Sequence, residues 1–349
     1  MKGTQNIKTG RNLSYTKRFE FICARFGLHA SVVLSAVLLP PAFYSCQKTG
    51  LPEQKRRFPV QIYIQRSEKT TLRSLDLFFF HDDALQRLDS YQHVENPSEA
   101  PVAGIAGSGK HLVAAISNFP GDSYSWKDIQ SSPHLSSRQF HLEDEDPENP
   151  LLYGVTHLEE GLSRTCKMKL EPMLSALHLR TLSCDFSGKP YEGKQLEKSS
   201  FFILNANSLT HPLDEDGVRE ESFINPGYLD EGAMERMSHP EMLFQELGRS
   251  FGAARENVEC TLYTYPNPVE EEGLGRPFTR FVIAGVLDGK TCYYPINIPG
   301  LAAGRKYTMD ITLTRMGSPD PDTPAESGTV ILEIDTKPWA EFDGYTLRF

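Results

Sequence analysis

Short runs of alternating or continuously apolar residues, separated by clusters of Gly, Pro, Asn and Asp, constrain the fold of this chain most. Residues 58–64 and 165–170 alternate between apolar and polar side chains, which is typical of a strand with one buried face. Residues 75–80 and 111–116 are apolar almost throughout, which indicates strands that are buried more completely. The spacing of these runs predicts an all-β protein.

The second half of the chain repeats this pattern. Residues 260–265 and 306–314 alternate in the same way. Residues 278–284 and 290–295 flank Asp288-Gly289, which is a strong signal for a tight hairpin turn. We therefore expect strands in both halves, with few helices.

A polar stretch rich in turn residues begins at residue 209, and we place a domain boundary there. We expect a first β-sandwich over residues 58–208 and a second over residues 209–349, in tandem. The best helical pattern lies at residues 241–247, and a short helix is also expected at residues 125–129.

The N-terminal region has the three parts of a bacterial secretion signal. A basic lead precedes the apolar run 30–39, two prolines interrupt that run, and Cys46 follows. The run is too short for a membrane span, which needs roughly 20 apolar residues. We interpret residues 1–45 as a signal peptide, Cys46 as a lipidation site and residues 46–57 as a lipidated tether. The alternative is an ordinary cleaved signal in which Cys46 has no role.

The charge of the chain excludes nucleic acid as a partner. The net charge is -10, and residues 1–45 hold six of the 36 basic residues and one of the 46 acids. The remainder carries 30 basic and 45 acidic residues, a net of -15. Such a surface repels phosphates, because nucleic-acid binding requires clustered Lys and Arg.

The cysteines are too few for a disulfide scaffold of an exported protein. Beyond the signal the chain has Cys46, Cys166, Cys184, Cys260 and Cys292, and no pair has the spacing of a metal site. We interpret the last four as small buried side chains. A bridge between Cys260 and Cys292 is left open.

Three patterns that carry chemistry in other proteins are weak here. Residues 104–110 match a phosphate-binding loop, but His111 replaces the required Ser or Thr and a strand follows, so we expect a loop between strands. The triplet 81–83 (His-Asp-Asp) follows a buried strand and indicates a solvated turn. The acidic residues 143–146 lack the turn glycine of a calcium loop. We expect no enzyme activity, no metal and no cofactor.

A longer series of segments resembles a known family. The series comprises residues 58–64, 75–80, 86–92, 111–118, 279–284, 292–296, 305–312, the Gly-Ser-Pro-Asp-Pro-Asp loop at 317–322, and Pro338-Trp339. Its order resembles that of the fimbrillin-type (type V) pilins, and most closely their lipid-anchored fimbrial anchor subunits. The resemblance extends over nearly the whole chain after the signal.

The resemblance implies two transthyretin-like (Ig-like) β-sandwich domains, export as a lipoprotein, and assembly with other fimbrial subunits at the outer membrane. In stalk subunits of the family an Arg-specific protease removes the first strand, and a strand from a neighbour fills the groove. Backbone hydrogen bonds and alternate side chains give such strand addition its strength and register. Strand complementation would use Val60, Ile62 and Ile64 in the first strand, and a donated segment would carry Tyr345, Leu347 and Phe349.

The link after the first strand favours the anchor over the stalk. Residues 65–74 contain two arginines, Arg66 and Arg73, and both are close to a strand. Proteases prefer exposed loop tips, so a short, held link is a poor substrate. If the link stays intact, Cys46 stays joined to the body and its lipid can hold a fimbria at the membrane.

Two other functions are left open. The chain could be a protease-matured stalk or tip pilin that is cut at Arg66 or Arg73. It could also be a surface lipoprotein that never polymerises and binds glycan or host protein, so that host or bacterial surface ligands would be its partners. Exposed aromatic residues in loops would mark this last function, and Tyr124, Trp126 and Trp339 are the candidates. We favour a packing role for Trp126.

Overall fold

The computed structural model describes residues 56–65, 71–97, 101–121, 123–161, 164–212, 222–323 and 328–339. The signal peptide, Cys46, Arg66 and the segment with Tyr345, Leu347 and Phe349 lie outside the described residues. The described residues belong to one compact unit.

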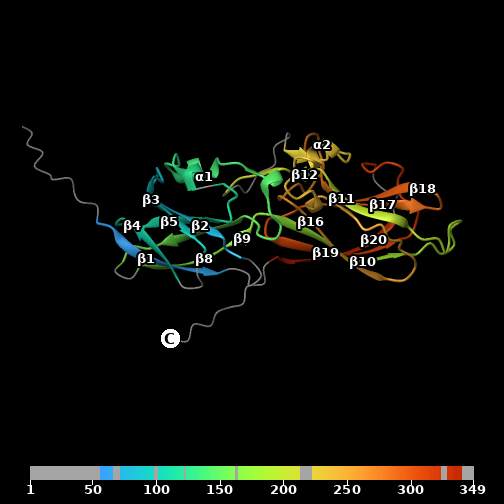
Figure 1. Cartoon of the computed structure of the whole chain (residues 1–349), viewed down its shortest axis with the longest axis horizontal. Helices are drawn as coiled ribbons and strands as arrows, with labels where there is room; N and C mark the ends of the chain where they lie inside the picture. The colour runs from blue at the N-terminus through green and yellow to red at the C-terminus, as the bar shows by residue number, and fades with distance from the viewer. Residues whose placement is uncertain are drawn as a thin grey trace, which may run out of the picture. The chain divides into compact units, whose positions relative to one another are not determined.

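Strands are the main secondary structure of the described residues, with only short helices, which confirms the all-β class (Figure 1). The strands are β1 (Phe58–Gln65), β2 (Ser74–His81), β3 (Leu88–Glu95), β4 (Val102–Ala106), β5 (His111–Ser117), β6 (Phe140–His141), β7 (Leu152–Leu158), β8 (Thr165–Lys169), β9 (Glu171–Pro172), β10 (Ser175–Cys184), β11 (Glu197–Leu204), β12 (Ala206–Asn207), β13 (Leu209–Thr210), β14 (Phe223–Ile224), β15 (Phe244–Glu246), β16 (Glu256–Thr264), β17 (Thr279–Leu287), β18 (Lys290–Ile298), β19 (Arg305–Leu313) and β20 (Val330–Pro338). The short helices are α1 (Ser132–Ser136), α2 (Glu231–Met234), η1 (Ser123–Trp126), η2 (Leu142–Asp144) and η3 (Pro240–Met242).

Two sheets form the first sandwich. Strands β4, β1 and β8 make a three-stranded sheet, and β3, β2, β5, β7 and β9 make a five-stranded sheet in that order. Their facing side chains form one apolar core, which includes Ile62, Leu77, Phe79, Val113 and Met168. Because side chains alternate between the two faces of a strand, these residues lie on the inner faces of the sheets. Their burial supplies most of the driving force that packs the two sheets together.

The five-stranded sheet is buried on its other face as well, which explains why β2 is apolar almost throughout. Phe78 and Phe80 point away from the first core and are fully buried by the segment that contains η1 and α1. Trp126 is 2% exposed and packs edge-on against Phe78, with 5.4 Å between ring centroids. The packing role expected for Trp126 is confirmed.

A second pair of sheets contains the rest of the chain. Their strand orders are β16-β10-β19-β20 and β15-β11-β17-β18. Strands β17 and β18 form the expected hairpin, in which Asp288 and Gly289 have φ angles of 49° and 74°. Positive φ at both central residues is what a tight hairpin turn requires. The turn prediction is therefore confirmed.

The strand pairing moves the proposed domain boundary. Strands β10 and β11, which the sequence assigned to the first sandwich, pair with β16, β19 and β17. The pairing therefore divides between Pro172 and Ser175, and not at 208/209. The composition near residue 209 suggested a boundary there, but β11 before it and β15 after it pair with each other. We propose two domains that meet at residues 173–174.

The helix predicted at residues 241–247 is wrong. The segment begins with the single turn η3 and continues as the edge strand β15, whose Phe244 pairs with Phe202 of β11. Met242 and Leu243 are fully buried and supply the apolar period that resembled a helix. Pairing with β11 satisfies the backbone of this segment, so tertiary context overrides the local pattern.

Gly104 permits close packing of the two sheets of the first sandwich, and this generates a prediction. A Cβ at Gly104 would lie 2.5 Å from Cζ of Phe79. We expect Gly104→Ala to lower the free energy of unfolding by about 1–3 kcal/mol in urea denaturation. Gly161→Ala is the matched control, because an added Cβ there meets nothing within 4 Å. Equal stability of the two variants would contradict this role of Gly104.

Candidate assembly site at the first strand

Strand β1 lies in the middle of the three-stranded sheet. Its first half pairs antiparallel with β4, from Phe58 opposite Ala106 to Ile62 opposite Val102. Its second half pairs parallel with β8, from Gln61 opposite Thr165 to Gln65 opposite Lys169. The strand therefore uses both of its edges, and its removal would leave a gap between β4 and β8.

The side chains predicted for strand complementation face the core. Val60 is 1% exposed and Ile62 is fully buried, and Ile64 packs partly buried against the same cluster. Fully burying one such aliphatic side chain contributes about 1.5–3 kcal/mol. The sequence prediction that these three residues share one face of the strand is confirmed, whereas their role in assembly stays a prediction.

Neighbouring strands hold β4 and β8 independently of β1. On one side the Ser90 hydroxyl of β3 donates to the carbonyl of Ile105 of β4. The side-chain amide of Gln92 donates to the carbonyl of Ala103 at 2.7 Å. On the other side β8 lies against β7, where Gly154 leaves no room for a Cβ beside the Lys169 carbonyl. The two strands that flank β1, β4 and β8, are therefore both attached to the five-stranded sheet.

Arg164 fastens the start of β1. Its buried guanidinium donates to the carbonyls of Gly107 and Gly109 and lies over the Phe58 ring, 5.4 Å from the centroid. Its own carbonyl accepts a hydrogen bond from the Gln61 amide at 2.9 Å. Stacking of this kind contributes about 0.5–2 kcal/mol. The sequence contained no signal for this role, because Arg164 precedes β8 as an ordinary loop residue.

The loop that resembled a phosphate site connects β4 and β5, which belong to the two different sheets of the first sandwich. Its backbone is occupied by protein contacts, because Asp89 accepts a hydrogen bond from the Gly107 amide and Arg164 binds the loop carbonyls. The prediction of a loop between strands is confirmed. Burial opposes the charge on Asp89, but the Gly107 amide and the nearby His111 and His81 hold the pKa of its carboxyl below the usual value.

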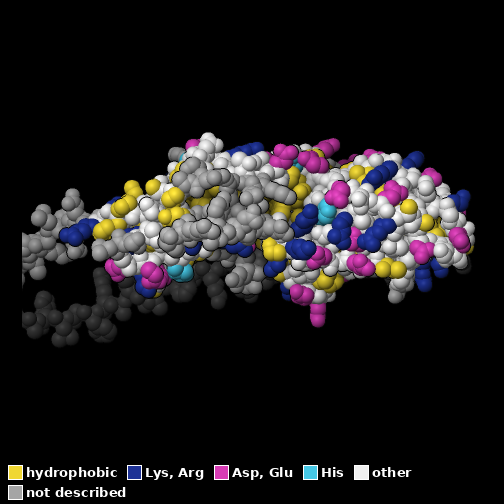
Figure 2. Space-filling model, turned by 90° about the horizontal axis from the view of Figure 1, so that it is seen from below, with side chains coloured by type: hydrophobic (Ala, Val, Ile, Leu, Met, Phe, Trp, Pro, Cys, Tyr) yellow, Lys and Arg dark blue, Asp and Glu magenta, His cyan; other side chains and the backbone are white. Residues whose placement is uncertain are grey.

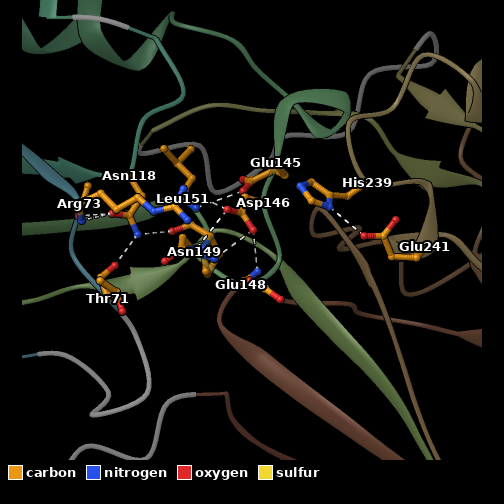
Figure 3. Close-up of polar contacts among 12 residues, drawn as sticks. Thr71, Arg73, Asn118, Glu145, Asp146, Glu148, Asn149, Leu151, His239 and Glu241 are labelled. Carbon is orange, nitrogen blue, oxygen red and sulfur yellow. Dashed lines mark hydrogen bonds and ion pairs between the residues drawn. The ribbon is translucent and has the colours of Figure 1, made fainter.

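The end of the link after β1 is held by four separate contacts (Figure 3). The Arg73 amide donates to Oδ1 of Asn118 at 2.9 Å, and the Arg73 carbonyl accepts from the Asn96 amide at 2.8 Å. The Arg73 guanidinium lies 3.2 Å from the carboxylate of Asp146. The Asn118 side-chain amide also donates to the carbonyl of Thr71 at 2.9 Å. The side chain of Arg73 is thus exposed, whereas its backbone is held by hydrogen bonds.

The acidic run 143–146 is a structural turn. Asp146 accepts hydrogen bonds from the Asn149 side chain and from the Glu148 and Asn149 amides. Burial opposes its charge, and these bonds together with Arg73 keep the pKa of Asp146 below its usual value. Asp83 likewise accepts from the amides of Leu85 and Gln86, so residues 81–83 begin a turn as expected. Within the described ranges no group of three or more His, Cys, Asp or Glu side chains is arranged to hold a metal ion.

Glu145 connects the two sets of sheets. Its buried carboxyl accepts hydrogen bonds from the Tyr265 hydroxyl at 2.9 Å and from the Leu151 amide at 3.1 Å. Nearby, β6 pairs with β13, with Phe140 opposite Thr210. Burial raises the pKa of Glu145 to about 7. A single buried carboxyl in an acidic run was not recognisable from the sequence.

The four described cysteines are buried and unbonded, as their apolar neighbours predicted. Cys260 and Cys292, for which a bridge was left open, are both free thiols. Burial raises the pKa of Cys166 to about 11 and that of Cys184 and Cys260 to about 12, so these thiols are unreactive at neutral pH. In the part of the chain that the structure covers, no helix has the length and apolarity to cross a bilayer.

Solved structures of several bacterial surface proteins share this fold. A candidate cell adhesion protein from Bacteroides eggerthii matches with a TM-score of 0.62 and 13% identity, covering 81% of this chain and 96% of that one. The FimA fimbrilin of Porphyromonas gingivalis matches with a TM-score of 0.59 and 11% identity, covering 83% and 99%. The tip fimbrial protein Mfa3 of the same species, truncated at its C-terminus, matches at 0.50 and 13%, covering 81% and 100%. No protein-family model and no curated protein matches the sequence.

The inward position of Ile62 generates a prediction. Ile62→Asp would bury an unpaired carboxylate between the two sheets of the first sandwich, so we expect a loss of roughly 4 kcal/mol or more, or failure to fold. Gln61→Asp, one residue away on the exposed face, should change stability by about 1 kcal/mol or less. Urea denaturation of both variants measures the difference. A tolerant Ile62→Asp variant would mean that β1 is not part of the core.

The raised pKa of Glu145 predicts how stability depends on pH. The folded protein retains a proton that the unfolded chain releases near the ordinary value of 4.5, so the free energy of unfolding falls as pH rises from 4.5 to about 7. The loss from this group is at most roughly 3 kcal/mol. Urea denaturation at pH 5 and pH 8 should show a smaller difference for Glu145→Gln than for the native chain. The exposed Glu148→Gln control should leave the difference unchanged.

Proposed function

We propose that this chain is a structural subunit of a cell-surface fimbria, and specifically the lipoprotein anchor that joins the polymer to the outer membrane. The fold that it shares with FimA and Mfa3, which are described as fimbrial proteins, supports the fimbrial role. Its partners are then other fimbrial subunits, bound by β-strand complementation, and the outer membrane, bound through lipid on Cys46. The fixed backbone at Arg73 is the observation that carries the anchor role.

An intact link makes β1 part of the anchor. The strand contributes Val60 and Ile62 to the core and pairs on both edges, so extracting it would expose apolar surface and unpaired backbone groups. While β1 stays in place, Cys46 stays covalently joined to the folded body. Each buried methylene of an attached acyl chain contributes about 0.8 kcal/mol, and two or more chains give stable anchoring.

The peptide bond after Arg73 is protected by the start of β2. The carbonyl of Ser74, on the far side of that bond, accepts hydrogen bonds from the Ser117 hydroxyl at 2.6 Å and the Asn118 amide at 3.3 Å. A protease must draw several residues into an extended conformation within its own cleft. Doing so here would break these bonds and those of Arg73, so cleavage requires local unfolding.

A protease-matured stalk or tip pilin is the second candidate. The observation that favours it is that β3 and β7 hold β4 and β8, so a groove would persist after β1 left. Cleavage at Arg66 would release β1, and a segment such as Tyr345, Leu347 and Phe349 of another subunit would fill the groove.

A surface lipoprotein that binds glycan or host protein has less support. Trp126, one of its three aromatic markers, is buried. Trp339 is half-buried and stacks on Tyr263 with 5.2 Å between ring centroids. The side chain of Tyr124 lies outside the described residues.

An Arg-specific protease and mass spectrometry test the anchor role together. The native protein should begin at Cys46 with fatty acid attached. In an Arg66→Lys chain, Arg73 is the one arginine of the link, and we expect no cleavage in the folded state because its backbone is held. Asn118→Ala removes that bond and should raise the cleavage rate at Arg73 at least roughly tenfold, at a cost of about 1–3 kcal/mol for the lost contact.

The stalk function predicts a different product. A native protein that lacks fatty acid and begins after residue 66 would contradict the anchor role. Rapid, single-site cleavage of the folded native chain at Arg66, with Arg66→Lys resistant, would favour the stalk function.

A further inference from the structure

The outward face of the β4-β1-β8 sheet has an unusual composition for this acidic chain. Alternation directs a second set of side chains away from the core, namely Pro59, Gln61, Tyr63, Ala103, Ile105, Thr165, Lys167 and Lys169. None of these side chains is acidic, although the chain carries a net charge of -10. Ile105 is 52% exposed, and Pro59 lies opposite it in the β1–β4 pairing.

Basic residues lie beyond both ends of this apolar pair. Arg56 and Arg57 are exposed immediately before β1, where Arg57 also donates to the Asp89 carbonyl at 3.2 Å, and Lys167 is exposed on β8 opposite Tyr63. Lys169 pairs with Glu171, so it adds no net charge. Figure 2 shows yellow side chains beside dark blue ones at the end of the molecule where the described chain begins. The face thus combines apolar side chains, a half-buried tyrosine and a positive margin.

The length of the tether limits how far the start of β1 can lie from a lipid on Cys46. Nine residues lie between Cys46 and Arg56, which makes ten steps along the chain, so a fully extended tether spans at most about 35 Å. A lipid on Cys46 would therefore hold the start of β1 close to the bilayer. The end of the sandwich at this point carries Asp82 and Asp83 in one turn and Glu159 and Glu160 in another, which anionic headgroups would repel. The outward sheet face has no such repulsion.

We propose that the outward face of the β4-β1-β8 sheet lies on the surface of an anionic bilayer. Ile105 and Pro59 contact the boundary between headgroups and acyl chains, Tyr63 lies at headgroup level, and Lys167, Arg56 and Arg57 neutralise lipid phosphates. The proposal rests on the proposed lipid anchoring, and it assigns to the anchor a defined orientation on the membrane. The five-stranded sheet then lies on the side of the first sandwich that faces away from the lipid.

Vesicle binding by a chain that cannot be acylated tests the face by itself. The chain from residue 46 onward with Cys46→Ser, which lacks the basic and apolar residues 1–45, should co-sediment with vesicles of phosphatidylglycerol and phosphatidylethanolamine more than with phosphatidylcholine vesicles, and added salt should reduce the difference. Lys167→Glu should weaken binding to the anionic vesicles at least roughly fivefold. Lys290→Glu, at an exposed lysine of β18, is the matched control and should have no effect.

A fluorescent label tests the orientation in the acylated protein. Ile105→Cys carries an environment-sensitive dye, and selective labelling is feasible because the four described cysteines are buried. We expect a blue shift on anionic vesicles at position 105 and none for Ile331→Cys, which is 57% exposed on β20. Equal shifts at both positions, or no shift at position 105, would overturn the proposal. Equal vesicle binding by the Cys46→Ser chain and its Lys167→Glu variant would also overturn the proposal. The exception is a fluorescence shift of the dye at position 105, and not at position 331, in the acylated protein.

The two proposals fail separately. Absence of fatty acid on the native Cys46 would remove the lipid anchor, whereas vesicle binding by the Cys46→Ser chain would still depend on Lys167. An acylated protein whose label at position 105 stays in water would retain the anchor and lose the orientation.

Discussion

The insertion of β1 between β4 and β8 is the interaction on which the rest of the first sandwich depends. One strand supplies backbone partners to two others, and its Val60 and Ile62 fill the core that joins the two sheets. β1 is the first strand of the described residues, so the proposed attachment and assembly would both act through the same eight residues that stabilise the core.

Polar contacts at the two ends of β1 make its placement specific. Arg164 fixes the start by binding two loop carbonyls and the Phe58 ring, and Asn118 and Asp146 fix the chain where β2 begins. Burial of alternate side chains excludes a one-residue slip in register, because such a slip would turn Val60 and Ile62 outward, and the directional contacts at both ends also oppose a two-residue slip. Asp146, which contacts Arg73, is next to Glu145, which accepts a hydrogen bond from Tyr265. One loop therefore contacts both the link after β1 and the second set of strands.

The strands were largely predictable because their side-chain pattern is local. The inward alternation of Val60, Ile62 and Ile64 and the Asp288-Gly289 hairpin follow from residue order and turn geometry. The domain boundary and the helix at residues 241–247 were not, because each depends on which distant strand a segment pairs with. Strand β10 joins β16 and β19, which lie far along the chain, and no local signal records that choice.

By itself, the sequence determined the fold class, an acidic chain of short alternating strands, and it predicted a secretion signal and a lipidated Cys46. Tertiary structure alone decided which residues matter around β1. Arg164, Asn118 and Glu145 act through partners that are 55, 45 and 120 residues away, so their roles exist only once the strands have paired. The alternation of apolar and polar side chains depends on residues that are close in the sequence. A hydrogen bond between distant loops forms only in the fold that brings them together.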